Sequence, residues 1–223
     1  MATIVLTHGA FHHGSCFDPL VAELAALGID AVMPELPLTD LDADEAAVRA
    51  VLDTCDGPVT LLGHSYGGAV ITVAGTHPAV DRLVYLAAIV PDAGEPATGA
   101  LVEVGGDFIA AMRVDDTGRP FIDPALAAGL FYPDLAPDLA EHHARGLRPG
   151  HTGGAVTVRE AAWRRRPSTY IVCADDPIIL PGSQRAIAAR TGADVVELAG
   201  DHSPMLARPA ELAALLAAVV TAR

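Results

Sequence analysis

Ser65 is the residue of this chain whose surroundings most clearly suggest chemistry. It lies in the sequence GHSYGG (residues 63–68), between two apolar runs. This fits the G-x-S-x-G pattern, in which a serine occupies a strained turn between a strand and a helix. Side chains at Gly63 or Gly67 would collide where the backbone doubles back. The pattern predicts a nucleophilic hydroxyl that projects into a site, with an ordinary helix N-cap serine as the alternative.

A base and an acid for Ser65 follow two later strand-like segments. A serine hydroxyl is a weak nucleophile unless a base accepts its proton and an acid orients that base. Asp175 and Asp176 follow one such segment, and His202 follows the next. The order Ser, Asp, His places all three groups at strand ends, where they can converge on one edge of a sheet. The residues alone leave Asp175 and Asp176 as alternatives for the acid.

The same edge must also stabilise the negative charge of a tetrahedral intermediate. One donor is expected to be the backbone N–H of Tyr66, the residue after the nucleophile. The second is expected from the glycine-containing loop at residues 8–14, with Ala10 as the first choice and Phe11 as the alternative. The dipole of the helix that follows Ser65 adds a favourable field for an anion.

The elements that must position these groups alternate along the chain. Strands are predicted at 3–7, 30–33, 59–62, 82–89, 169–174 and 194–198. Helices are predicted at 17–27, 42–55, after Ser65, at 183–190 and from 209 to the end. Short, nearly unbroken apolar strands between helices indicate an α/β fold with a mostly parallel sheet covered by helices on both faces. The length of 223 residues fits a single domain, 1–223.

Residues 91–167 interrupt this alternation and are predicted to form a small helical cap over the sheet edge. Helical fragments are expected at 95–104, 124–130 and 137–146. Long insertions in α/β sheets are usually functional, although a purely structural excursion is the alternative. Four residues are expected to line the substrate pocket: Phe11, His12, Phe131 and Tyr132.

Composition excludes several function classes. All 14 basic residues are arginines, and 28 acidic residues give a formal charge of −14, which disfavours nucleic acid and anionic membranes as partners. The three cysteines form no C-x-x-C pair, and the histidines of loop 8–14 are expected to bind no metal. No apolar run approaches the roughly 20 residues that span a bilayer. The sequence thus predicts a soluble cytoplasmic protein without a cofactor, and leaves open whether it forms a homodimer.

Four motifs resemble the α/β-hydrolase fold, and within it a lid-bearing group of plant methylesterases, hydroxynitrile lyases and bacterial esterases. They are HGAFH (8–12), GHSYGG (63–68), TYIVCADD (169–176) and DHSPMLARP (201–209). The cap segment from residues 131–134 through 147–149 also resembles that group. The resemblance covers essentially the whole chain and implies Asp176, rather than Asp175, as the acid.

The resemblance also implies an activity. It indicates a serine hydrolase that cleaves a small carboxylic ester through Ser65, His202 and Asp176 and an acyl-enzyme intermediate. Lyases of the group carry a lysine after the catalytic histidine, where this chain has Ser203 and no lysine anywhere. Hydrolysis is therefore favoured over a lyase reaction, and the third alternative is a ligand-binding receptor that retains its triad.

Overall fold

A six-stranded, fully parallel sheet forms the centre of the protein. The computed structural model describes residues 2–99, 102–151 and 156–221. The strands lie in the order β2-β1-β3-β4-β7-β8. They are β1 (Ala2–Thr7), β2 (Ile29–Val32), β3 (Val59–His64), β4 (Val80–Leu86), β7 (Ser168–Cys173) and β8 (Asp194–Leu198). Strands β3 and β7 are buried along their whole length, as expected of a sheet covered on both faces.

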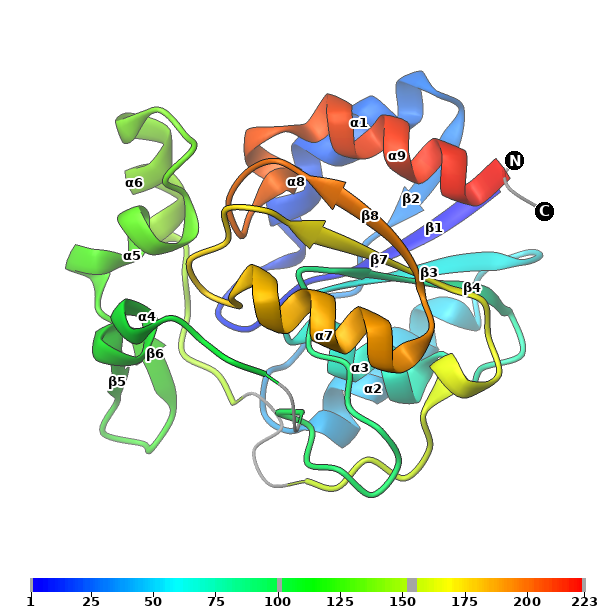
Figure 1. Ribbon diagram of the computed structural model, residues 1–223, viewed down its shortest axis with the longest axis horizontal. Helices are drawn as coiled ribbons and strands as arrows, with labels where there is room; N and C mark the ends of the chain where they lie inside the picture. Colours follow the sequence, from blue (N-terminus) through cyan, green and yellow to red (C-terminus); the bar gives the residue numbers. More distant parts are fainter. Residues whose placement is uncertain (1, 100–101, 152–155, 222–223) are drawn as a thin grey trace.

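Helices cover both faces of this sheet (Figure 1). One face carries α1 (Asp18–Ala26) and α9 (Pro209–Thr221), and the other carries α2 (Leu41–Leu52), α3 (Gly67–Ala74) and α7 (Pro181–Thr191). Every residue of α3 is buried, which explains why its sequence is apolar on all sides. The predicted α/β fold with a parallel sheet and helices on both faces is confirmed. Within the described ranges, no helix is long and apolar enough to cross a membrane.

Local sequence signals set the helix boundaries. Helix α2 begins after Asp40, whose carboxylate accepts the N–H of Ala43 at 2.8 Å as an N-cap. Helix α7 begins at Pro181 and ends before Gly192, which has a φ of 67°. A proline at the first position and a glycine after the last are the residues that suit those ends.

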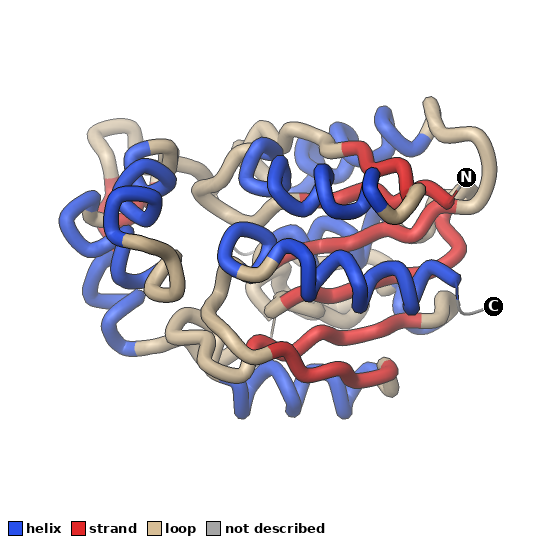
Figure 2. The backbone as a smooth tube through the Cα atoms, turned by 90° about the horizontal axis from the view of Figure 1, so that it is seen from above, coloured by secondary structure: helices blue, strands red, loops and turns tan. Residues whose placement is uncertain are grey.

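The remaining elements lie together beyond one end of the sheet. They are α4 (Gly106–Ala111), β5 (Met112–Val114), β6 (Pro120–Ile122), α5 (Pro124–Phe131) and α6 (Pro137–Arg145). In Figure 1 strands β7 and β8 point toward this group, and Figure 2 again places it at one end of the strands. Because the sheet is parallel, this is the carboxyl end of every strand. Strand β1 begins and α9 ends at the opposite end of the molecule (Figure 1).

Two of the three predicted cap helices occur, but the helix expected at 95–104 is wrong. The described parts of that range, 95–99 and 102–104, contain turns and isolated bridges, and the helix of this region is α4, at Gly106–Ala111. Gly99 has a φ of 75°, which ends any helical course. The N–H of Ala97 donates to Val156 at 2.9 Å, so the segment pairs with a distant part of the chain.

Three short helices complete the fold. They are the 3-10 helices η1 (Gly14–Phe17) and η2 (Ala162–Arg164) and the short helix α8 (Pro204–Ala207). Helix α8 follows the loop after β8 and leads into α9, so it fixes the path of the chain directly after His202.

Candidate active site

Ser65 lies on the turn between β3 and α3 and has a φ of 53°. This left-handed conformation is unusual for a residue other than glycine and stores strain at the turn. The neighbouring glycines permit it. A Cβ on Gly67 would lie 2.5 Å from the carbonyl oxygen of Thr7, and one on Gly63 would collide with the backbone of Gly67. Strand β1 and helix α3 therefore leave no room for a side chain at Gly67 and Gly63, the two positions predicted to need a small residue.

Hydrogen bonds fix the Ser65 backbone to the end of β4. Its N–H donates to Leu86 at 3.1 Å, and its carbonyl oxygen accepts from Gly68 and Ile89, both at 3.0 Å. The side chain remains half-buried. A Cβ on Gly9 would lie 2.9 Å from the Cβ of Ser65, so the loop after β1 lies directly against the serine.

His202 and Asp176 form a fully buried pair. The Nδ1 atom of His202 donates to Oδ2 of Asp176 at 2.7 Å, and neither side chain is exposed. Because Nδ1 carries the proton toward the carboxylate, Nε2 holds the lone pair. That Nε2 atom is buried and has no hydrogen-bond partner in the described part of the chain. The arrangement leaves one imidazole nitrogen free to accept a proton.

Further hydrogen bonds hold the Asp176 carboxylate in place. Its Oδ1 atom accepts the N–H groups of Ile178 and Ile179, at 2.7 and 3.1 Å. Its Oδ2 atom accepts from Nε2 of Gln184 at 2.8 Å. Sequence reasoning missed Gln184, because nothing in its position on α7 reveals that its side chain returns to the end of β7.

Asp175, the alternative acid, is placed differently. Its side chain is exposed and accepts the N–H of Gly200 at 3.0 Å. Of the two aspartates, only Asp176 contacts His202. Asp176 is therefore the aspartate that we carry forward as the candidate acid.

His64 supports the same region as a neutral donor. Its Nε2 atom donates to the carbonyl oxygen of His202 at 2.7 Å, and the two rings lie 4.7 Å apart. Burial, together with the nearby His202, holds the pKa of His64 well below its ordinary value. His64 thus links the serine turn to the loop that carries His202.

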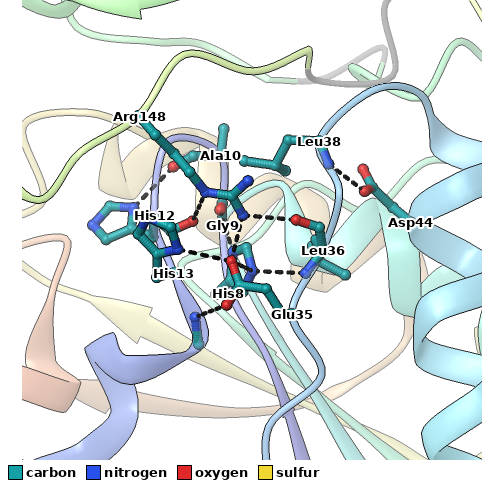
Figure 3. A network of polar contacts seen from close by, with 11 residues as sticks. His8, Gly9, Ala10, His12, His13, Glu35, Leu36, Leu38, Asp44 and Arg148 are labelled. Carbon is teal, nitrogen blue, oxygen red and sulfur yellow. Dashed lines mark hydrogen bonds and ion pairs between the residues drawn. The ribbon is translucent and has the colours of Figure 1, made fainter.

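The backbone N–H groups of Ala10, Phe11 and Tyr66 donate to no acceptor within residues 2–99, 102–151 and 156–221. In the loop after β1, protein donors occupy the carbonyl oxygens instead (Figure 3). The Gly9 and Ala10 oxygens accept from the Nδ1 atoms of His8 and His12, both at 2.8 Å. Free N–H groups opposite fixed carbonyls form a polar surface that suits an anion.

Arg148 and Glu35 clamp this loop from outside (Figure 3). The backbone N–H of Arg148 donates to Phe11 at 2.9 Å, and its guanidinium donates to the carbonyl oxygen of His12 at 3.1 Å. Glu35 accepts from the guanidinium at 2.7 Å and from the N–H of Gly14 at 2.8 Å. Arg148 thereby joins the segment after α6 to the loop after β1.

Tyr66 contributes only its backbone to this surface. Its hydroxyl donates to Oδ2 of Asp44 on α2 at 2.8 Å, away from the serine. The N–H of Leu38 donates to the other carboxylate oxygen at 2.7 Å. Burial raises the pKa of Asp44, and burial together with this carboxylate raises the pKa of Tyr66.

The four residues predicted to line a pocket are all buried and lie next to one another. The Phe131 ring lies 5.1 Å from His12, 6.4 Å from Phe11 and 6.1 Å from His202. The Tyr132 hydroxyl lies 2.9 Å from Nε2 of His12. His12 and Tyr132 also line a cavity of about 220 Å³ between η1 and α6. Phe131 is thus the aromatic side chain of this group that contacts His202.

Other features of the described residues lie away from this region. A cavity of about 630 Å³ lies between α2, α3 and residues 157–160, and none of the predicted site residues lines it. Within the described ranges, no group of three or more His, Cys, Asp or Glu side chains is arranged to hold a metal ion.

The chain is similar to hydrolases over nearly its whole length. A sequence model described as the alpha/beta hydrolase family matches residues 4–215. "Probable hydrolase R7" of Phoma sp. is 31% identical over 240 residues, 96% of each chain. Methylesterase 7 of Arabidopsis thaliana is 27% identical over 249 residues, 95% of this chain and 94% of its own. The crystal structure of a pyrethroid hydrolase from Sphingobium faniae superposes with a TM-score of 0.82 at 27% identity, over 99% of this chain and 98% of that one.

Proposed function

Because the chain belongs to the alpha/beta hydrolase family, we propose that it is a serine hydrolase that cleaves a small carboxylic ester. Ser65 is the nucleophile, His202 the base and Asp176 the acid that orients it. The observation that carries the proposal is the buried His202–Asp176 pair, in which Nε2 of His202 has no hydrogen-bond partner among the described residues. This pair lies at the same sheet edge as a serine in a left-handed turn.

The first half of the reaction forms an acyl-enzyme. His202 Nε2 accepts the proton of the Ser65 hydroxyl as the oxygen attacks the ester carbonyl. The negative charge that develops on the carbonyl oxygen is stabilised by the N–H groups of Tyr66 and Ala10, with Phe11 as the alternative to Ala10. The protonated His202 then gives its proton to the leaving alkoxide, and the alcohol departs.

The second half releases the acid. His202 accepts a proton from water, which attacks the acyl carbonyl, and the same N–H groups stabilise the second tetrahedral intermediate. Its collapse returns the proton to Ser65 through His202. Asp176 keeps its negative charge throughout and stabilises the imidazolium, supported by its bonds to Ile178, Ile179 and Gln184.

The substrate is expected to be compact and apolar. The names of two relatives, a methylesterase and a pyrethroid hydrolase, indicate ester substrates. Phe131 places an aromatic ring 6.1 Å from that of His202, which suits an apolar group on one side of the scissile bond. Residues 91–167, proposed as the cap, supply that ring.

A fluorophosphonate probe tests the proposal directly, because it labels only an activated serine. We expect the wild type to be labelled, and to hydrolyse p-nitrophenyl acetate, while Ser65→Ala is not labelled and His202→Ala is labelled very slowly. Cyanohydrin cleavage, measured in parallel, tests the lyase alternative. An unlabelled, correctly folded wild type would overturn the assignment of Ser65. Ligand binding without turnover, unchanged in Ser65→Ala, would favour the receptor alternative.

A further inference from the structure

Both ring nitrogens of His12 are engaged, and the two bonds fix its tautomer. Nδ1 faces the carbonyl oxygen of Ala10 at 2.8 Å and must donate, because a carbonyl oxygen only accepts. Nε2 therefore carries the lone pair and accepts from the Tyr132 hydroxyl at 2.9 Å. The His12 side chain is 3% exposed, and burial lowers its pKa to about 3, so the ring is neutral near pH 7.

The bond from His12 determines where a candidate oxyanion donor points. The Ala10 carbonyl and the Phe11 N–H belong to the same planar peptide and point in opposite directions. Holding the carbonyl against His12 therefore holds the N–H on the other side, where no described residue accepts it. Phe11 has a φ of 67°, so this peptide lies in a part of the loop that needs external support.

His8 makes the equivalent bond one peptide earlier, and the comparison isolates what is particular to His12. Its Nδ1 atom holds the Gly9 carbonyl, and hence the Ala10 N–H, and its Nε2 atom accepts from the backbone N–H of Leu36 at 3.0 Å. That outside donor belongs to the loop after β2. The outside donor to His12 is a side chain of the inserted region, at the end of α5.

We propose that Tyr132 and His12 are positioning residues for ester hydrolysis: the Tyr132 hydroxyl fixes the His12 tautomer, and His12 holds the Ala10–Phe11 peptide so that the Phe11 N–H, the alternative to Ala10, donates to the oxyanion. This inference rests on the proposed function of the site. On this inference, two residues expected to line the pocket connect the cap to the loop after β1. Without the Tyr132 hydroxyl, the buried Nε2 lone pair lacks a partner, and the tautomer that releases the Ala10 carbonyl becomes accessible.

Two substitutions of His12 separate its two bonds. An asparagine amide nitrogen occupies nearly the place of Nδ1 and can still donate to the Ala10 carbonyl. A glutamine amide oxygen reaches the place of Nε2, so it can accept from Tyr132, but the bond to Ala10 is lost. We expect His12→Asn to lower kcat for p-nitrophenyl acetate by about threefold, because the bond to Ala10 is kept while the bond to Tyr132 is lost. We expect His12→Gln to lower kcat by about tenfold or more, below the 10²–10³ that losing a whole donor costs. KM should change little in both.

Tyr132→Phe tests the outer bond, with Tyr85→Phe as the matched control. Tyr85 is also fully buried, and among the described residues its hydroxyl has one hydrogen-bond partner, Thr72 of α3 at 3.1 Å. Tyr132→Phe should lower kcat by about three- to tenfold, and Tyr85→Phe should not. Because Tyr132 acts through His12, adding Tyr132→Phe to His12→Asn should cause no further loss of kcat. Thermal unfolding of each variant shows whether it is folded.

The outcomes distinguish this inference from the proposed function. Equal kcat values for folded His12→Asn and His12→Gln, or additive effects in the double variant, would overturn the positioning role while Ser65 labelling persists. If the wild type is not labelled by the fluorophosphonate, the proposed function fails and the inference fails with it. Fluorophosphonate labelling that remains in His12→Gln, at a reduced rate, is the expected result.

Discussion

Asp134 and Asp201 each donate a backbone N–H to the carboxylate of the other, at 3.0 and 3.3 Å. Asp134 lies two residues after Tyr132 in the inserted region, and Asp201 directly precedes His202. Arg208 lies 3.5 Å from the Asp134 carboxylate and offsets part of the negative charge. Burial raises the pKa of Asp201. The reciprocal pair joins the inserted region to the loop that carries the proposed base.

Replacing Asp134 tests this connection. Asp134→Ala removes the acceptor of the Asp201 N–H, so we expect a loss of about 1 kcal/mol in the free energy of unfolding and a several-fold lower kcat. Asp134→Asn keeps an oxygen acceptor and should retain most of both. Urea denaturation and ester hydrolysis measure the two effects. Equal behaviour of the alanine and asparagine variants would contradict a role for the hydrogen bond.

The adjacent aspartates allow a second matched comparison. Asp176→Asn places an amide where the carboxylate accepts the His202 N–H, and such a change can force the wrong tautomer, so kcat should fall by about 10³–10⁴. Asp175→Asn retains an oxygen that can accept the Gly200 N–H, and kcat should stay within about threefold of the wild type. Steady-state kinetics on both variants decide the matter. A larger loss of kcat for Asp175→Asn than for Asp176→Asn would show that Asp176 is not the acid.

The serine turn should tolerate no side chain at Gly67. A Cβ there would lie 2.5 Å from Thr7 and 2.6 Å from His8, both backbone oxygens of β1 and its loop. We expect Gly67→Ala to destabilise the protein by several kcal/mol, more than the 1–3 kcal/mol typical of overpacking. Gly182→Ala, in α7 with open space around it, is the control and should stabilise by about 0.5–1 kcal/mol. Thermal unfolding of the two variants should shift in opposite directions.

Stability should fall as the pH is lowered from 6.5 toward 4. Burial lowers the pKa of His8 to about 4 and that of His12 to about 3, and His64 is lowered as well. The unfolded chain takes up these protons near pH 6.5 while the folded protein does not. Each histidine therefore removes up to about 1.4 kcal/mol of unfolding free energy per pH unit across this window.

A variant of a single histidine checks the origin of that slope. His12→Asn removes one group that titrates only on unfolding, so its unfolding free energy should depend less steeply on pH than that of the wild type. Asp44 and Asp201 titrate in the opposite sense because their pKa values are raised, but the variant retains both. Equal slopes of unfolding free energy against pH for His12→Asn and the wild type would contradict the lowered pKa of His12.

The fold followed from sequence because its signals are local. The predicted strand at 194–198 coincides with β8, and those at 3–7 and 59–62 fall inside β1 and β3. Such strands are short apolar runs bounded by turn residues, which a linear sequence displays directly. The prediction at 95–104 failed because residues 95–97 pair with residues 156–158, about sixty positions later, and residues 103 and 104 pair with residues 179 and 180.

The residues of the candidate site were easier to predict than their contacts. Ser65 and His202 stand in motifs. Asp175 and Asp176 are adjacent, and the course of the turn after β7 decides which of the two side chains contacts His202. Gln184 and Leu36 carry no motif, since one acts from a helix and the other through a backbone N–H. Hydrogen bonds of this kind follow from the folded path of the chain.

The two ends of the described chain lie at the end of the sheet opposite α4, α5 and α6 (Figure 1). A fusion partner, affinity tag or solid support attached at either terminus is therefore joined to the face farthest from Ser65 and His202. Tethered in this way, the protein turns α4, α5 and α6, which lie beyond the carboxyl edge of its sheet, toward the surrounding solution. A support or a linked domain can then be attached at either end without covering the proposed active site.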